Sequence, residues 1–183
     1  VQQLAALVDG DAFGSLEGAT MTRGLVGSTG ISPGSFSTDT NRSGGGVLME
    51  KGCHDLSQLC EVFRDADIEV TESDITWRGR LDVAVEATLR VGDPYDVPVD
   101  YRISMVEPYE TAATFQFERA TATCRHPEAD DALSVSVPNA DRGTSDGFGF
   151  QRPAQAARST EEAMYLRWRD FLSALATDDN NPE

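Results

Sequence analysis

The sequence has one lysine, three cysteines and two histidines, and it contains no long apolar run. No stretch approaches the roughly 18 apolar residues that a membrane-spanning helix needs. The segment from Val1 to Val8 lacks a basic flank and is too short for a secretory signal. The sequence therefore predicts neither a membrane span nor a signal peptide. The first residue is not Met, which leaves open whether the N-terminus has been processed.

The shortage of lysine accompanies a large excess of acidic residues. The chain has 31 Asp and Glu against 15 basic residues, a formal net charge of −16, and Lys51 is its single lysine. Such a charge opposes compaction by self-repulsion, which molar salt screens because the Debye length falls to about 3 Å. The composition resembles that of proteins from halophilic archaea and their viruses; an acidic protein from a GC-rich genome is the alternative. It predicts a location in a virion or in the cytoplasm of a halophilic host.

A basic stripe, which a phosphate backbone requires of its partner, is missing. Arg78, Arg80 and Arg90 alternate with Asp82 and Glu86 along one segment. The sequence therefore predicts no direct contact with nucleic acid.

The three cysteines are Cys53, Cys60 and Cys124. An odd number fits no closed disulfide framework, which favours reduced thiols. Together with His126 they could offer a Cys₃His set to zinc, although the spacing matches no familiar zinc motif. Cys60 also falls on the apolar face of a predicted helix, which favours packing in the core. The metal site stays open with these four candidates, and no other cofactor is predicted.

Apparent catalytic motifs lack the context that their chemistry needs. Residues 30–34 and 143–147 both match G-x-S-x-G, which acts as a nucleophile only between a strand and a helix. Pro33 directly follows Ser32, and neither window has that context. The glycine-rich run 24–30 is not followed by the lysine of a phosphate-binding loop. The sequence predicts no catalytic residue, and therefore a protein that is not an enzyme.

Apolar residues alternate with polar ones between residues 67 and 125. The runs 81–91 and 97–105 show this period most clearly and predict an antiparallel hairpin with one wet face. The sequence predicts further strands at 67–72, 74–80, 111–125 and 133–137. Strands at this spacing favour a mainly β fold, an antiparallel sandwich or barrel of the jelly-roll or tail-tube type.

Helical periodicity marks three segments. Residues 1–9 predict a short helix, and 55–65 a second one with apolar residues at 56, 59, 60 and 63. A third, amphipathic helix is expected near 160–176, where Ser159 and Glu162 form a capping box. The Gly/Ser-rich stretch 10–46 predicts a long loop or arm with one or two short strands, such as 20–26. These patterns divide the chain into residues 1–46, an N-terminal helix and arm, and 47–183, a β-rich domain with a C-terminal helix.

An acidic β-rich domain with a long arm and no active-site motif favours a structural, self-assembling homo-oligomer. The hypothesis is a virion subunit, a capsid or tail component of a halophilic-archaeal virus, with copies of itself and other virion proteins as partners. The alternative is a domain that binds a small hydrophobic ligand, with a helix closing a curved antiparallel sheet. The residues expected to line that pocket are Trp77, Tyr101, Phe115 and Phe117.

Overall fold

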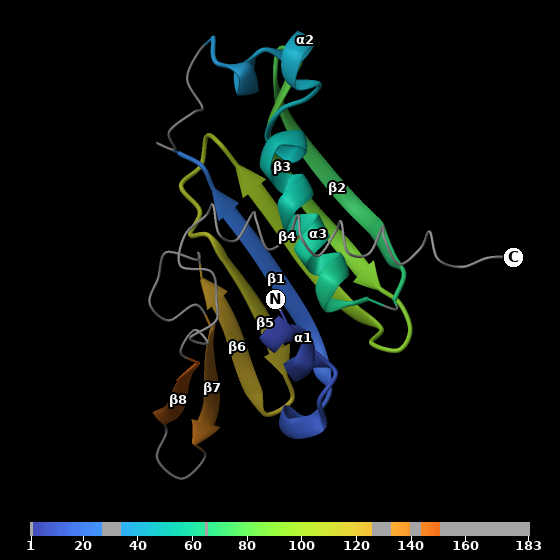
Figure 1. The fold of residues 1–183 in the computed structure, drawn as a ribbon, viewed down its shortest axis with the longest axis vertical. Helices are drawn as coiled ribbons and strands as arrows, with labels where there is room; N and C mark the ends of the chain where they lie inside the picture. The colour runs from blue at the N-terminus through green and yellow to red at the C-terminus, as the bar shows by residue number, and fades with distance from the viewer. Residues whose placement is uncertain (1, 27–33, 65, 126–132, 140–143, 151–183) are drawn as a thin grey trace, which may run out of the picture. The chain divides into compact units, whose positions relative to one another are not determined.

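The computed structural model describes residues 2–26, 34–64, 66–125, 133–139 and 144–150. Eight strands form one sheet in the order β2-β3-β4-β1-β5-β6-β7-β8 (Figure 1). They are β1 (Leu16–Gly24), β2 (Ile68–Arg78), β3 (Leu81–Val91), β4 (Val97–Ser104), β5 (Ala112–Phe117), β6 (Ala120–Arg125), β7 (Leu133–Asn139) and β8 (Thr144–Phe150). The mainly β class is confirmed. The sandwich or barrel is not, because the described strands form a single open sheet.

The sheet is mixed. Strands β1 and β4 pair in parallel, and the other neighbouring strands pair antiparallel. The predicted hairpin is confirmed as β3 and β4, in register from Ala84 opposite Ser104 to Val91 opposite Val97. A short loop, Gly92 to Asp96, closes it, and Asp96 adopts a positive φ of 52°.

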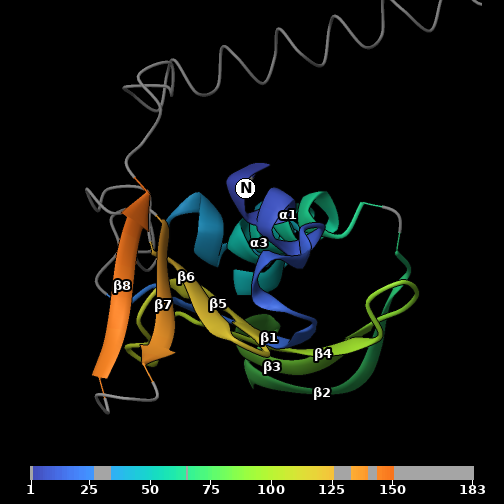
Figure 2. The ribbon, with the colours of Figure 1, turned by 90° about the horizontal axis from the view of Figure 1, so that it is seen from below.

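Two helices cover one face of the sheet (Figure 2). Helix α1 (Gln2–Val8) and helix α3 (Cys53–Val62) confirm the two predicted N-terminal and central helices to within a few residues. The helix expected near 160–176, with Ser159, lies outside the described residues. Short helical turns are η1 (Asp11–Phe13), η2 (Phe36–Thr38), α2 (Thr40–Ser43) and η3 (Leu48–Gly52), the last a π-turn that runs directly into α3.

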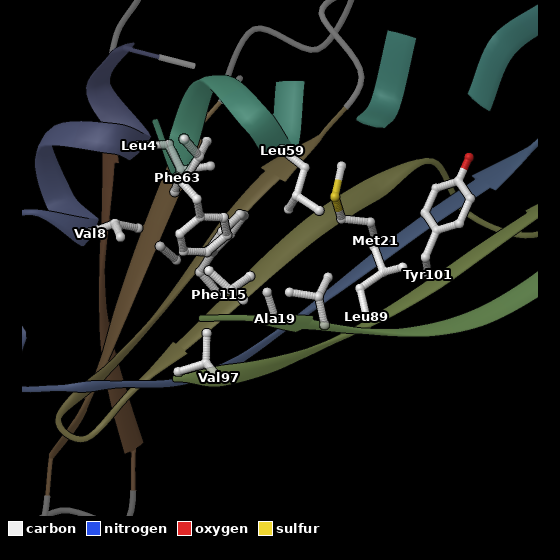
Figure 3. Packing of buried hydrophobic residues seen from close by; sticks show 14 of the residues in the cluster. Leu4, Val8, Ala19, Met21, Leu59, Phe63, Leu89, Val97, Tyr101 and Phe115 are labelled. Carbon is white, nitrogen blue, oxygen red and sulfur yellow. The ribbon is translucent and has the colours of Figure 1, made fainter. Parts of the chain in front are cut away.

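The hydrophobic core lies between the two helices and the sheet (Figure 3). Leu59 and Phe63 of the α3 segment pack onto Phe115, and α1 contributes Leu4 and Val8. Because strand side chains alternate between faces, most buried residues of β3 and β4 are the apolar positions of the predicted hairpin. Asp82 and Ser104 are the polar residues that these two strands bury.

Several segments differ from the sequence prediction. The Gly/Ser-rich stretch 10–46 supplies β1, which pairs with β4 and β5 in the middle of the sheet. The single strand expected at 111–125 is the hairpin of β5 and β6, and the two expected at 67–72 and 74–80 are one strand, β2. Residues 144–150, for which no strand was predicted, form β8.

Candidate functional site

A helical segment, residues 46–55, crosses one end of the helix-covered face and is held by two buried carboxylates. The first is Asp82 of β3, whose side-chain oxygens accept hydrogen bonds from the backbone N–H groups of Gly46 (2.5 Å) and Leu48 (2.9 Å). These donors are the free N–H groups at the start of a helix, and a carboxylate there also meets the positive end of the helix dipole. Asp82 therefore fixes where the segment begins.

Close approach requires a glycine at position 46. A Cβ atom built there would lie 2.0 Å from the carbonyl oxygen of Asp82. The glycine run 44–46 thus lets the chain pass against β3 closely enough for the carboxylate to reach the backbone.

The second anchor is Asp55, in the first turn of α3 and 4% exposed. Arg23 of β1 donates bidentate hydrogen bonds to this carboxylate. Its Nε is 2.9 Å from Oδ1 and 2.8 Å from Oδ2, and a terminal guanidinium nitrogen also donates to Oδ1. The hydroxyl of Tyr101, on β4, donates to Oδ2 at 3.3 Å. Figure 3 shows that hydroxyl at the end of the ring nearest the helical layer.

Burial governs the electrostatics of this anchor. Burial is the main cause that raises the pKa of Tyr101 above its ordinary value, and the negative charge of the adjacent Asp55 carboxylate is the second. The phenol therefore stays protonated and remains a hydrogen-bond donor. The hydrogen bond to Asp55 raises the pKa of Arg23, outweighing the lowering by burial. The anchor therefore keeps its ion pair and its phenol hydrogen bond throughout the neutral pH range.

Polar side chains lie between the two anchors. Glu50 sits in the π-turn η3, and π-turns are frequent at functional sites. Its Oε1 is 3.6 Å from the Lys51 ammonium, whereas its Oε2 is buried and has no hydrogen-bond partner. His54 follows one turn later and is exposed. It is the one histidine among the described residues. The exposed imidazole can exchange a proton with a ligand hydroxyl, and the partly exposed Glu50 carboxylate, four residues earlier, can accept hydrogen bonds from a polar ligand.

Sequence reasoning missed this site. It assigned no functional role to Glu50, Asp55 or Arg23. The usable signal was the four-residue spacing of Glu50 and His54 at the start of a helix, directly after the glycine run.

The candidate zinc ligands are dispersed in the structure. Cys53 and Cys60 are exposed on α3, Cys124 is partly buried on β6, and His126 lies outside the described residues. Within the described ranges, no three His, Cys, Asp or Glu residues gather in a way that could hold a metal ion. A zinc site that includes His126 stays a prediction. The prediction that Cys60 packs in the core was wrong, because Cys60 is exposed, whereas its neighbours Leu59 and Val62 are buried.

The two G-x-S-x-G windows and the glycine-rich run 24–30 form no catalytic site among the described residues. Ser32 belongs to a stretch outside the described residues, and Ser145 lies within strand β8, away from any strand-to-helix turn in the described chain. Gly24 ends β1, and a Cβ atom there would lie 2.1 Å from the carbonyl oxygen of Tyr109. Close packing against that backbone accounts for this glycine.

The pocket expected for a hydrophobic ligand is filled. Tyr101 and Phe115 are buried in the core, and Trp77 is 57% exposed. The hollow between α1, α3 and the sheet measures about 30 Å³, room for about one water molecule. A larger surface hollow of about 200 Å³ lies next to Asp9 and Tyr95, whose side chains share a hydrogen bond of 2.6 Å.

Among the described helices, none is long and apolar enough to cross a membrane.

Comparison with known proteins finds no family model and no curated protein that match the sequence. Solved structures do match the fold. The 3-ketoreductase KijD10 from Actinomadura kijaniata, in complex with NADP and TDP-benzene, is 16% identical with a TM-score of 0.71, and the match covers 100% of this chain and 52% of that one. Levoglucosan dehydrogenase in complex with NADH and levoglucosan is 14% identical with a TM-score of 0.70, covering 96% and 55%. Its complex with NADH and L-sorbose gives a TM-score of 0.71.

These similarities correct the functional prediction. The fold is shared with oxidoreductases, so the hypothesis of a non-enzymatic virion subunit, a capsid or tail component, is wrong. So is the alternative of a hydrophobic-ligand domain, since the described core leaves no such cavity. At this level of identity the likeness defines the fold, and the chain spans about half the length of the proteins it resembles.

Proposed function

We propose that this chain forms the sugar-binding half of an NAD(P)-dependent oxidoreductase that interconverts a sugar hydroxyl and a carbonyl. One observation carries the proposal: the fold matches levoglucosan dehydrogenase over 96% of this chain. The complexes of levoglucosan dehydrogenase with levoglucosan and with L-sorbose support a sugar as the class of substrate. The match to a 3-ketoreductase supports carbonyl–hydroxyl chemistry.

The described residues do not fit a dinucleotide. A pyrophosphate is usually held by the glycine-rich turn of a βαβ unit within a parallel sheet. Here one strand pair is parallel, and the glycines at 24, 27 and 30 lack the G-x-G-x-x-G spacing. We therefore assign the dinucleotide to a separate binding domain, in the same polypeptide or in a partner.

Oxidation of an alcohol needs a group that takes the hydroxyl proton, and reduction needs one that returns it. His54 has the right chemistry, because an imidazole ring can both donate and accept a proton. Glu50 is partly exposed, and its carboxylate can accept a hydrogen bond from a substrate hydroxyl. We assign His54 as the acid–base group and Glu50 as the residue that orients it or the sugar.

The surroundings of this pair suit a sugar ring, which has hydroxyls at its rim and apolar C–H faces. Lys51 supplies a donor next to Glu50. Met49 is 58% exposed, and Trp77 pairs across the sheet with Asp82, the residue that holds Gly46 and Leu48. An exposed aromatic ring can stack on the C–H face of a sugar, and we propose Trp77 for this role.

Steady-state kinetics of the complete enzyme, with its dinucleotide-binding domain, test the proposal. His54→Gln should lower kcat by about 100- to 10,000-fold because proton transfer loses its base. Glu50→Gln keeps the shape of the side chain and should lower kcat less. Cys53→Ser, an exposed neighbour, is the matched control and should leave kcat unchanged. Unchanged turnover in His54→Gln would contradict the assignment.

Self-assembly with a second copy also stays a proposal. The sheet face turned away from α1 and α3 carries small hydroxyl side chains that another copy can cover. They include Thr20, Thr22, Thr114, Thr121, Thr123, Ser134 and Ser136. Sedimentation should show an oligomer that Thr114→Arg disrupts and Ser57→Arg, on α3, retains. A monomer at all concentrations would contradict this proposal.

A further inference from the structure

The Asp55 anchor has a geometry that stability alone does not explain. The partners of Asp55 come from elements far apart in sequence, since Arg23 lies on β1 and Tyr101 on β4. These two strands form the one parallel pair of the described sheet. A buried ion pair loses hydration that its attraction only partly restores, and apolar residues of similar volume often stabilise a protein as well or better. The cluster is therefore weak evidence for stability.

The cluster does fix the orientation of the first turn of α3. A guanidinium fork binds a carboxylate in one plane through two parallel hydrogen bonds. The Tyr101 hydroxyl approaches the same carboxylate from the neighbouring strand. These contacts fix how the first turn of α3 is rotated about its axis and how far it stands from the sheet. Because Asp55 points into the sheet, the preceding residue, His54, is directed to the exposed side.

We propose that Asp55, Arg23 and Tyr101 are positioning residues that hold His54 and Glu50 in the arrangement needed for proton transfer. This inference rests on the proposed function of the same site. Small displacements of a reacting group cost large factors in rate, on the order of 100-fold for about 1 Å. A loosened anchor should therefore lower turnover while leaving sugar binding and overall stability nearly intact.

The test replaces the whole cluster at once, so that no charge is left unpaired. In the triple variant Arg23→Met, Asp55→Leu, Tyr101→Phe, the melting temperature should stay within a few degrees of the wild type. The single variant Asp55→Leu leaves Arg23 buried without its partner and should melt roughly 10 °C lower. Arg125→Met with Glu110→Leu removes an exposed pair, 3.1 Å apart, and is the matched control.

Two readouts separate positioning from structure. In the 183-residue chain, backbone amide exchange at residues 50–55 should quicken about 10-fold or more in the triple variant, with the rest of α3 unchanged. In the complete enzyme, the kcat of the triple variant should fall about 10- to 100-fold at unchanged KM. The kcat of Arg23→Lys should lie between that of the triple variant and that of the wild type. The control pair should change neither readout.

The outcomes are distinguishable. A triple variant that keeps wild-type exchange and kcat overturns the positioning role and leaves the proposed function standing. A loss of kcat that merely follows a fall in melting temperature also overturns it. If the wild-type enzyme turns over no sugar, the proposed function fails, and amide exchange alone decides whether the cluster orders residues 50–55.

Discussion

Gly46 shows how one missing side chain permits the site. A Cβ atom at this position would lie 2.0 Å from the carbonyl oxygen of Asp82, which is backbone and cannot move aside. Gly46→Ala should lower the free energy of unfolding by about 2–4 kcal/mol and weaken sugar binding, since it pushes the segment off β3. Denaturant titration measures the change.

The control for that substitution is Gly92→Ala. A Cβ atom at Gly92 would make an ordinary contact of 3.5 Å with the carbonyl oxygen of Asp67. This variant should stay within about 1 kcal/mol of the wild type. Equal effects of the two substitutions would show that the close approach at Gly46 is not what limits the site.

Two tyrosines predict how stability responds to alkali. Hydrogen bonding to Glu107 is the main cause that raises the pKa of Tyr109 to about 12, and burial raises the pKa of Tyr101 further. The unfolded chain releases these protons near pH 10. Because the folded pKa values are the higher ones, the contribution to stability is complete below pH 10 and is lost as pH rises through about 12.

Unfolding titrations across this range test the tyrosine prediction. The free energy of unfolding should fall between pH 10 and 12 in the wild type and fall less steeply in Tyr109→Phe. Identical slopes in the two proteins would mean that Tyr109 does not hold its proton in the folded state.

Helix α3 gives a prediction at the scale of an element, because neighbouring residues face opposite environments. Leu59 is 1% exposed and packs in the core, whereas Cys60 is exposed. Leu59→Ala should lower the free energy of unfolding by about 2–5 kcal/mol, and Cys60→Ala should change it by about 0.5 kcal/mol or less. A larger loss in Cys60→Ala would restore the sequence-based view that position 60 faces the core.

Strands in which apolar and polar residues alternate strictly could be predicted from the sequence. Strands without this alternation could not. The β3–β4 hairpin follows from its period of two and the turn at Gly92. Strand β1 was predicted only in part, as a short strand at 20–26, because Gly18, Ala19 and Thr20 carry little hydrophobic signal. In the structure β1 lies between β4 and β5. The turn between β5 and β6 has no Gly, Pro or Asn; backbone hydrogen bonds from Glu118 to Ser15 and from Arg119 to Phe13 hold it.

The site was harder to predict because its parts meet only in the folded chain. Arg23, Asp55 and Tyr101 are separated by 32 and 46 residues along the sequence, and nothing local links them. In a chain with 31 acidic residues, the two carboxylates that matter do not stand out by type. Burial distinguishes Asp55 and Asp82, and burial is a property of the fold.

At the scale of the whole molecule, the net charge of −16 predicts dependence on salt. Raising KCl from about 0.1 M to about 2 M should raise the melting temperature, because screening weakens repulsion among the acidic side chains. Calorimetry at several salt concentrations measures it. A melting temperature that falls or stays constant would favour an ordinary acidic protein over one adapted to a saline cytoplasm.

The central claim is that this fold binds a sugar at the segment that carries Glu50 and His54. Nuclear magnetic resonance of the isotope-labelled chain, titrated with levoglucosan, L-sorbose and a nucleotide-linked sugar, tests it most directly. At least one sugar should shift the amide signals of residues 46–55, and His54→Gln or Glu50→Gln should weaken that binding. Shifts confined to the hollow beside Asp9 and Tyr95, or none with any sugar, would contradict the account.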